Sequence, residues 1–220
     1  IEKDFNNVIS GMNIDLFVNR IRSYSPLTSE NLIKMSNTVT DVSKDILPNE
    51  SLDCVVYGCT SGTIATGYEK IKNKINLAKP SAKVTTPSTA ALNALKRMNI
   101  KKLSIFTPYP KDLNNEVIKY FEENGFTITN NLYFDISDDI EIGKVDKKHL
   151  FNVLLNMDHK NSDALFVSCT ALPVLSMIDD LEKKLEKTVL SSNQVLIWDT
   201  LQSIGKKENI NGFGKLFKNN

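Results

Sequence analysis

Strand-like and helix-like stretches alternate along nearly the whole chain of 220 residues, and this alternation limits the folds that the chain can adopt. The strand-like stretches are short and rich in β-branched and aromatic residues, as buried parallel strands are. Residues that open helices, such as Thr28 and Pro87, begin the stretches between them. The pattern predicts an α/β fold with parallel sheets and right-handed crossovers. The predicted strands are Ile14–Arg20, Leu52–Gly58, Lys83–Thr86, Leu103–Thr107, Phe126–Phe134, Ala164–Ser168 and Thr188–Leu190.

The composition excludes several classes of protein. A hydrophobic fraction of 41% and a charged fraction of 24% are typical of a globular chain with one domain or two small ones. A formal net charge of +1 argues against general nucleic-acid binding. The most apolar stretch, Ala164–Ile178, is too short to span a bilayer and contains several polar residues. The chain starts at Ile1 with no signal-peptide pattern, so a cytoplasmic protein that does not enter a membrane is expected.

The cysteines and histidines carry further information. Three cysteines, Cys54, Cys59 and Cys169, form an odd set without disulfide spacing, which favours a reducing compartment. The two histidines, His149 and His159, form no ligand pattern with them, so no metal site is predicted.

An internal repeat links two of the cysteines. Residues 53–60 and 163–170 share an Asp, a mostly apolar run and a final Cys-Thr pair, and their cysteines lie half the chain length apart. Both copies fall where a predicted strand ends, and the carboxyl ends of strands are where open α/β sheets bind ligands. The repeat predicts two similar lobes that place Cys59 and Cys169 on opposite sides of one cleft.

The residues after each cysteine indicate how a thiol could react there. Cys59 precedes Thr60 and Ser61, and Cys169 precedes Thr170 and Ala171. Both stretches can open a helix, and a helix N-terminus lowers the pKa of a thiol and offers amides to an anion. The competing interpretation is that a buried cysteine merely fills space, which is the prediction for Cys54 inside its strand.

Other polar residues have simpler interpretations. The prolines around Tyr109 would hold its phenol in a fixed orientation at the cleft. Ser191, Ser192 and Asn193 follow the last strand and are expected to cap a helix. Asp138, Asp139 and Glu141 are expected in a solvated loop, and Trp198 in the core or an interface.

Taken together, these motifs resemble those of a known group. Four segments resemble the maleate cis-trans isomerase and arylmalonate decarboxylase group. They are residues 59–63, the loop 107–109, residues 168–173 and residues 192–194 with Trp198. The group, which also contains ectoine-utilisation proteins, belongs to the aspartate/glutamate racemase superfamily. The resemblance runs through nearly the whole chain in order.

The resemblance implies a fold and an activity. It implies two Rossmann-like three-layer lobes related by a pseudo-twofold axis, with the active site between them and no metal or organic cofactor. The first lobe would comprise residues 1–90 and 195–220, and the second residues 91–194. The implied activity is cis-trans isomerisation of a small unsaturated dicarboxylate, of the maleate-to-fumarate type, by a protein that is a dimer or tetramer.

The resemblance also implies roles for single residues. Cys59 would add to the double bond as a thiolate, and Cys169 would supply and recover a proton. Thr60, Ser61, Thr170 and Ala171 would stabilise the developing charge. Tyr109 would bind a substrate carboxylate.

The residues at the two cysteines favour the maleate isomerase branch over the other members of the superfamily. Racemases of the superfamily carry other triplets at these cysteines, and arylmalonate decarboxylase keeps only the second one. Three alternative functions nevertheless stay open. They are a two-cysteine racemase of amino acids or hydantoins, a decarboxylase that uses Cys169 alone, and a non-catalytic binder of small acids. Ile1 resembles a point just after the first strand and loop of the family, so that strand and loop are expected to lie outside this sequence.

Overall fold

Parallel sheets form the centre of the protein, as the alternation of strands and helices predicts. The computed structural model describes residues 1–218, and its strands form one sheet of two strands and one of four. All strand pairs in both sheets are parallel. The two-stranded sheet pairs β1 (Cys54–Val56) with β2 (Lys83–Thr85), and the four-stranded sheet has the order β4 (Thr127–Tyr133), β3 (Lys102–Thr107), β5 (Ala164–Val167), β6 (Thr188–Ser191). Six of the seven predicted strands are therefore confirmed, each with small shifts at its ends.

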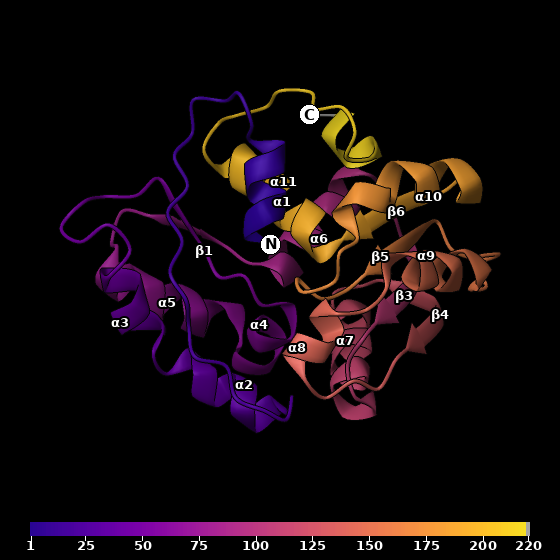
Figure 1. Cartoon of the computed structure of the whole chain (residues 1–220), viewed down its shortest axis with the longest axis horizontal. Coiled ribbons are helices and arrows are strands. Elements are labelled where there is room, and N and C mark those ends of the chain that lie inside the picture. The colour runs from indigo at the N-terminus through magenta and orange to yellow at the C-terminus, as the bar shows by residue number, and fades with distance from the viewer. Residues whose placement is uncertain (219–220) are drawn as a thin grey trace.

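Helices surround both sheets (Figure 1). The α-helices are α1 (Glu2–Val8), α2 (Ser29–Ser36), α3 (Val39–Lys44), α4 (Thr60–Thr66), α5 (Tyr68–Ala78), α6 (Pro87–Arg97), α7 (Lys111–Glu123), α8 (Asp139–Gly143), α9 (Lys147–Asn156), α10 (Ile178–Leu185) and α11 (Ser192–Ser203). Two short 3-10 turns, Leu175–Met177 and Lys215–Lys218, complete the described elements. None of the helices in residues 1–218 is long and apolar enough to cross a membrane.

The helices begin where the capping residues predict. The Thr28 hydroxyl accepts the backbone N–H of Asn31 at the start of α2, and Thr86 caps α6 with Pro87 at its first position. Ser191 and Gln194 form a reciprocal capping box at the start of α11. These short-range hydrogen bonds explain why the boundaries could be predicted from local sequence.

The predicted strand at Ile14–Arg20 is wrong. Residues 13–24 form an extended segment with no strand pairing, and Phe17 and Val18 stay about half exposed. β1 pairs with β2 along one edge, and in the described structure its other edge faces this segment across a groove. Apolar alternation made the segment look like a strand, but a strand also needs a neighbour to bond with.

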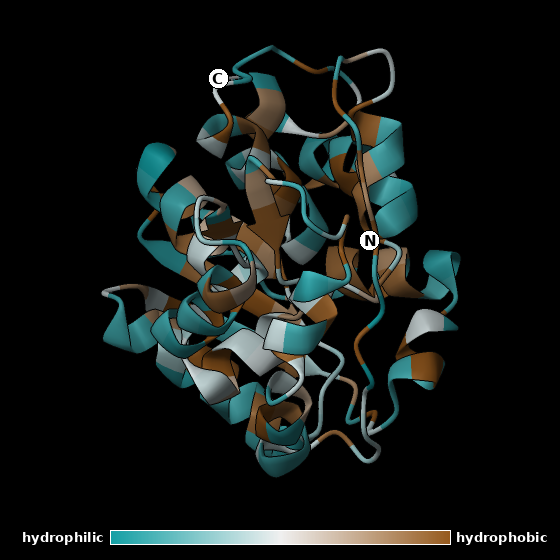
Figure 2. Cartoon of the chain, turned by 90° about the vertical axis from the view of Figure 1, so that its left-hand side faces the viewer, coloured by the Kyte–Doolittle hydropathy of each residue, from teal (hydrophilic) through white to brown (hydrophobic). Residues whose placement is uncertain are grey.

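The core lies around the four-stranded sheet. All four residues of β5 are fully buried, and β3 is buried from its second residue to its last. Figure 2 shows the hydrophobic segments inside the molecule and hydrophilic turns on its outer helices. α11 packs against α6 and reaches both β1 and β2, so the end of the chain returns to the first sheet. The proposed lobe boundaries at 90/91 and 194/195 both fall inside these two helices.

Candidate active site

The first cysteine caps a helix, as its sequence predicts. Cys59 is the N-cap of α4, and its sulfur accepts the backbone N–H of Gly62 at 3.3 Å. The Ser61 hydroxyl lies 3.9 Å from the same sulfur. Two buried residues, Thr60 and Ser61, form the first turn, while Cys59 itself is half-buried. The thiol therefore lies at the carboxyl end of β1 with polar hydrogens directed at it.

Gly62 leaves no room for a side chain beneath this thiol. A Cβ at Gly62 would lie 2.8 Å from the Cys59 Sγ, 3.0 Å from the Tyr57 hydroxyl and 3.1 Å from the Met35 Cε. We expect Gly62→Ala to displace the sulfur and to slow its alkylation by iodoacetamide by roughly tenfold or more. Gly143→Ala, where a Cβ would meet nothing within 4 Å, is the matched control and should leave the rate unchanged. Equal rates in the two variants would contradict this packing.

The backbone conformation at the second cysteine differs from that at the first. Cys169 follows β5 with φ of 100°, a region that residues other than glycine rarely occupy. Residues 170–174 form no helix, so the predicted helix opening after Cys169 is wrong. The Cys169 sulfur instead accepts the backbone N–H of Ala171 at 3.4 Å. A tight turn, rather than a helix N-terminus, thus presents this thiol.

One serine hydroxyl joins the two cysteine-bearing turns. The Ser192 Oγ accepts the Thr60 hydroxyl at 2.9 Å and the backbone N–H of Cys169 at 3.0 Å. Thr170 adds a second link, because its hydroxyl donates to the Gly58 carbonyl at 2.9 Å. Residues more than 100 positions apart in the sequence are therefore held together by buried hydrogen bonds.

Removal of this shared hydroxyl should affect reactivity at both turns. Ser192→Ala leaves the Thr60 hydroxyl and the Cys169 N–H without their acceptor in a buried place. We expect the alkylation rates of Cys59 and Cys169 to change together, each by roughly fivefold or more. Ser203→Ala, on the same helix, removes a hydroxyl that donates to the Thr200 carbonyl and lies beside Cys54, and it is the control for Cys59 and Cys169. Unchanged rates at both thiols in Ser192→Ala would exclude the positioning role.

Tyr109 lies where the sequence predicts, next to the thiols. Its side chain is 2% exposed, and burial raises the pKa of its phenol well above the usual range. The thiols of Cys169 and Cys59 raise this pKa further, which places the phenol close to both. Tyr109 therefore keeps its proton and can act as a hydrogen-bond donor.

Burial dominates the ionisation of both thiols. It raises the pKa of Cys59 to about 11, against the lowering effect of the Gly62 N–H. It raises the pKa of Cys169 to about 12, against the Ala171 N–H and the Tyr109 hydroxyl. The predicted lowering of the thiol pKa by a helix N-terminus is therefore wrong in net effect, because desolvation of the thiolate outweighs the nearby donors.

Asp139 also influences the site. Its carboxylate raises the pKa of both Cys59 and Cys169. Asp139 is exposed to solvent, as predicted, but it opens α8 and does not lie in a loop. Asp138 caps the same helix by accepting two backbone N–H groups. The helix thus holds a negative charge near both sulfurs.

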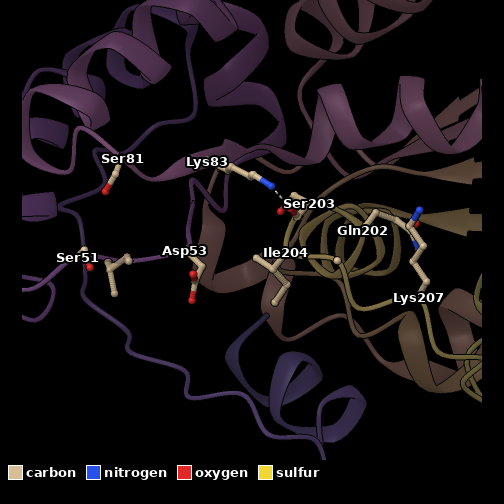
Figure 3. Close-up of a pocket in the computed structure, with 10 residues that line it drawn as sticks. Ser51, Asp53, Ser81, Lys83, Gln202, Ser203, Ile204 and Lys207 are labelled. Carbon is tan, nitrogen blue, oxygen red and sulfur yellow. Dashed lines mark hydrogen bonds between the residues drawn. The ribbon is translucent and has the colours of Figure 1, made fainter.

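Two cavities lie beside the two-stranded sheet. A groove of about 350 Å³ runs between β1 and the extended segment 15–21 and reaches Tyr57, Gly58 and Cys59. A polar pocket of about 600 Å³ lies at the opposite ends of β1 and β2, lined by residues such as Asp53, Lys83 and Lys207 (Figure 3). In that pocket the Lys83 ammonium donates to the Ser203 carbonyl. Ligands of parallel sheets bind at the carboxyl ends of the strands, so the cysteine end is the candidate site.

No metal centre is evident in this part of the molecule or elsewhere in residues 1–218. The described residues contain no group of three or more His, Cys, Asp or Glu side chains that could hold a metal ion. His159 is buried, and its ring nitrogens lie 2.7 Å from the Ser104 hydroxyl and from the Leu154 carbonyl. This histidine has a structural role.

The comparisons with known proteins agree with this arrangement. Residues 64–217 match the sequence model of the arylmalonate decarboxylase family. The chain belongs to this family. The matched range includes Tyr109 and Cys169 but begins after Cys59.

Individual members of the group show the same likeness. A maleate isomerase of Geobacillus stearothermophilus is 28% identical over 199 residues, which cover 86% of this chain and 78% of the relative. An arylmalonate decarboxylase of Bordetella bronchiseptica is 27% identical over 136 residues, 60% of this chain and 57% of the relative. A maleate cis-trans isomerase of Nocardia farcinica, solved with a covalently bound succinylcysteine intermediate, is similar in fold with a TM-score of 0.91 and 19% identity, over 100% of this chain and 93% of that one. These likenesses confirm the predicted superfamily and the α/β fold.

Three residues near the thiols of this family member were not predicted as site residues. Tyr57 lies two residues before Cys59 and was included only in a strand. Ser192 was expected to cap a helix and was otherwise part of a motif of the resemblance, without a role of its own. Asp139 was expected in solvent, where it lies. The repeated Asp-to-Cys-Thr pattern could have drawn attention to Tyr57 through its spacing, whereas Ser192 and Asp139 reach the site through tertiary contacts alone.

Proposed function

We propose that this protein isomerises a small unsaturated dicarboxylate from cis to trans, as in the conversion of maleate to fumarate, without a cofactor. The observation that carries the proposal is the pair of thiols on two turns joined through Ser192. The maleate isomerase relative and the succinylcysteine intermediate in the Nocardia farcinica isomerase support it.

Cys59 acts as the nucleophile in this proposal. Its thiolate attacks one carbon of the double bond and forms a C–S bond, while the π electrons move to the neighbouring carbon. The carboxylate on that neighbouring carbon delocalises the charge, and the hydroxyls and amides at Thr60, Ser61, Thr170 and Ala171 stabilise it. Tyr109 donates a hydrogen bond to a substrate carboxylate.

Cys169 completes the cycle as acid and base. Its S–H gives a proton to the carbanion, which leaves a succinyl thioether whose central C–C bond is single and rotates. The Cys169 thiolate then removes a proton from that carbon, the double bond forms again, and the C–S bond breaks to return the Cys59 thiolate. Burial raises the pKa of Cys169, so its thiol holds a proton at neutral pH and can donate it.

Decarboxylation of an arylmalonate is the second candidate. The family match and the Bordetella bronchiseptica relative favour it. That reaction would use Cys169 as the proton donor to the carbanion left by loss of CO2. It would not require Cys59. The isomerase and decarboxylase functions can therefore be distinguished by their substrates and by the cysteine on which turnover depends.

The decisive experiment supplies purified protein with maleate and follows the appearance of fumarate by ultraviolet absorbance. The same preparation is incubated with an arylmalonate, with a chiral amino acid and with a hydantoin. Fumarate formation supports the proposal. Turnover of an arylmalonate alone, or racemisation alone, by a folded preparation would replace it with the corresponding alternative, and tight binding without turnover would favour a non-catalytic acid binder.

The pH dependence of isomerisation follows from the raised thiol pKa values. At neutral pH nearly all Cys59 is the unreactive thiol, because its pKa is about 11 and lies above the working pH. The thiolate fraction rises about tenfold for each unit of pH below that value. We therefore expect kcat/KM for maleate to increase from about pH 6 to about pH 9. A decrease across this range would contradict Cys59 as a thiolate nucleophile.

We further propose the setting in which the protein works. The three cysteines are free thiols, which supports a reducing, cytoplasmic compartment. We also propose that the protein is a dimer or tetramer. Each chain would be divided into one lobe of residues 1–90 with 195–220 and a second lobe of residues 91–194. The mass of the purified protein in solution tests the oligomeric state.

A further inference from the structure

Tyr57 carries a buried hydroxyl without a partner next to the proposed nucleophile. Its side chain is 6% exposed, and its oxygen has no hydrogen-bond partner. A buried hydroxyl left unbonded destabilises the fold, so such a group calls for an explanation.

The geometry places this hydroxyl close to the Cys59 sulfur. Both atoms lie within 3.0 Å of the single point where a Cβ on Gly62 would stand. Backbone bonds hold the two residues in place, because the Cys59 N–H donates to the Tyr57 carbonyl at 3.0 Å and the Tyr57 N–H donates to the Thr85 carbonyl at 3.1 Å. Both residues line the groove beside β1.

The surroundings of the sulfur leave room for such a donor. The Gly62 N–H lies at 3.3 Å and the Ser61 hydroxyl at a long 3.9 Å. Among the described residues, the charged side chain that shifts the pKa of Cys59 is Asp139 of α8, and it opposes the thiolate. The other titratable groups that face it are Cys169, Tyr57 and Tyr109, whose own pKa values are raised by Cys59. A neutral thiol is a weak acceptor, whereas a thiolate accepts strong hydrogen bonds.

We propose that Tyr57 is a positioning residue for the nucleophile: its hydroxyl donates a hydrogen bond to the Cys59 thiolate and stabilises that form. Burial holds the pKa of this phenol far above its usual value, so Tyr57 stays protonated and acts as a donor rather than a base. Tyr109 lies beside the Cys169 sulfur, so each thiol has a buried tyrosine next to it. The inference rests on the proposed function in taking Cys59 as the nucleophile.

The test measures the reactivity of Cys59 directly and needs no turnover. The full chain is treated with iodoacetamide over a range of pH, and peptide mass spectrometry gives separate alkylation rates for Cys59, Cys169 and Cys54. Tyr57→Phe removes only the unpartnered oxygen. We expect it to slow Cys59 alkylation near pH 8 by roughly tenfold or more and to move the pH of half-maximal rate upward, with Cys169 unchanged.

Tyr68→Phe is the matched control, since it removes a hydroxyl from the same region, one bonded to the Val84 carbonyl. It should leave the Cys59 profile unchanged. A second variant with 3-fluorotyrosine at position 57, a stronger donor, should move the profile to lower pH.

An unchanged Cys59 profile in folded Tyr57→Phe, or an equal change at Cys169, would overturn the inference. Absence of maleate turnover in the unsubstituted protein would instead overturn the proposed function and leave this result standing.

Discussion

Cys59→Ser is expected to lower kcat for maleate by at least about a thousandfold, because a serine hydroxyl does not ionise in the working range and cannot add to the double bond. The substitution is chosen over alanine for a structural reason. Cys59 is the N-cap of α4, and a serine oxygen can still accept the Gly62 N–H. The thermal unfolding midpoint should therefore stay close to that of the unsubstituted protein, and ultraviolet detection of fumarate gives the rate.

Cys54→Ser is the control for this experiment. Cys54 lies within β1 and is half-buried, and its sulfur is close to Ser203 rather than to the residues of the candidate site. Activity close to that of the unsubstituted protein is expected. If Cys59→Ser kept activity within about tenfold, Cys59 would not be the nucleophile.

Cys169→Ala is the second substitution with a large expected effect. It removes the group that gives and recovers the proton, which should lower kcat by roughly a hundredfold to ten-thousandfold. Water can still protonate the carbanion, but nothing in the site then removes a proton from the thioether. We therefore expect a covalent adduct on Cys59, seen as an increase in protein mass equal to one maleic acid molecule and located by peptide mapping.

The double variant Cys59→Ser with Cys169→Ala is the control for the adduct and should gain no mass. Cys169→Ala that neither loses turnover nor accumulates adduct would remove Cys169 from the mechanism. An adduct that maps to Cys54 would mean that the increase in mass results from general thiol reactivity rather than from catalysis.

The strands and most helix starts could be predicted because their signals are local. A short apolar run such as Ala164–Val167 favours a buried strand, and caps such as Thr28 bond to residues three positions away. The error at Ile14–Arg20 has a physical reason. Strand propensity in one segment says nothing about whether a neighbour offers its backbone groups.

The repeated cysteine pattern shows how far local sequence reaches. Cys59 and Cys169 end nearly equivalent stretches, yet one caps a helix and the other adopts a φ of 100°. The turn after Cys169 contains Pro173 and is held from outside by Ser192 and by the bond from Thr170 to Gly58. Contacts with residues distant in the sequence therefore determine the backbone conformation at Cys169.

The sequence by itself determined the fold class, the parallel strands and the two thiols that end them, because hydropathy periodicity and residue chemistry act over a few neighbours. The tertiary structure alone decided the ionisation of those thiols and the residues that serve them. Burial and the charge of Asp139 raise both pKa values, and Ser192 bonds to the Thr60 hydroxyl and to the Cys169 backbone N–H from another part of the chain. Desolvation and long-range hydrogen bonds depend on which distant segments pack together, and that information is absent from any short stretch of sequence.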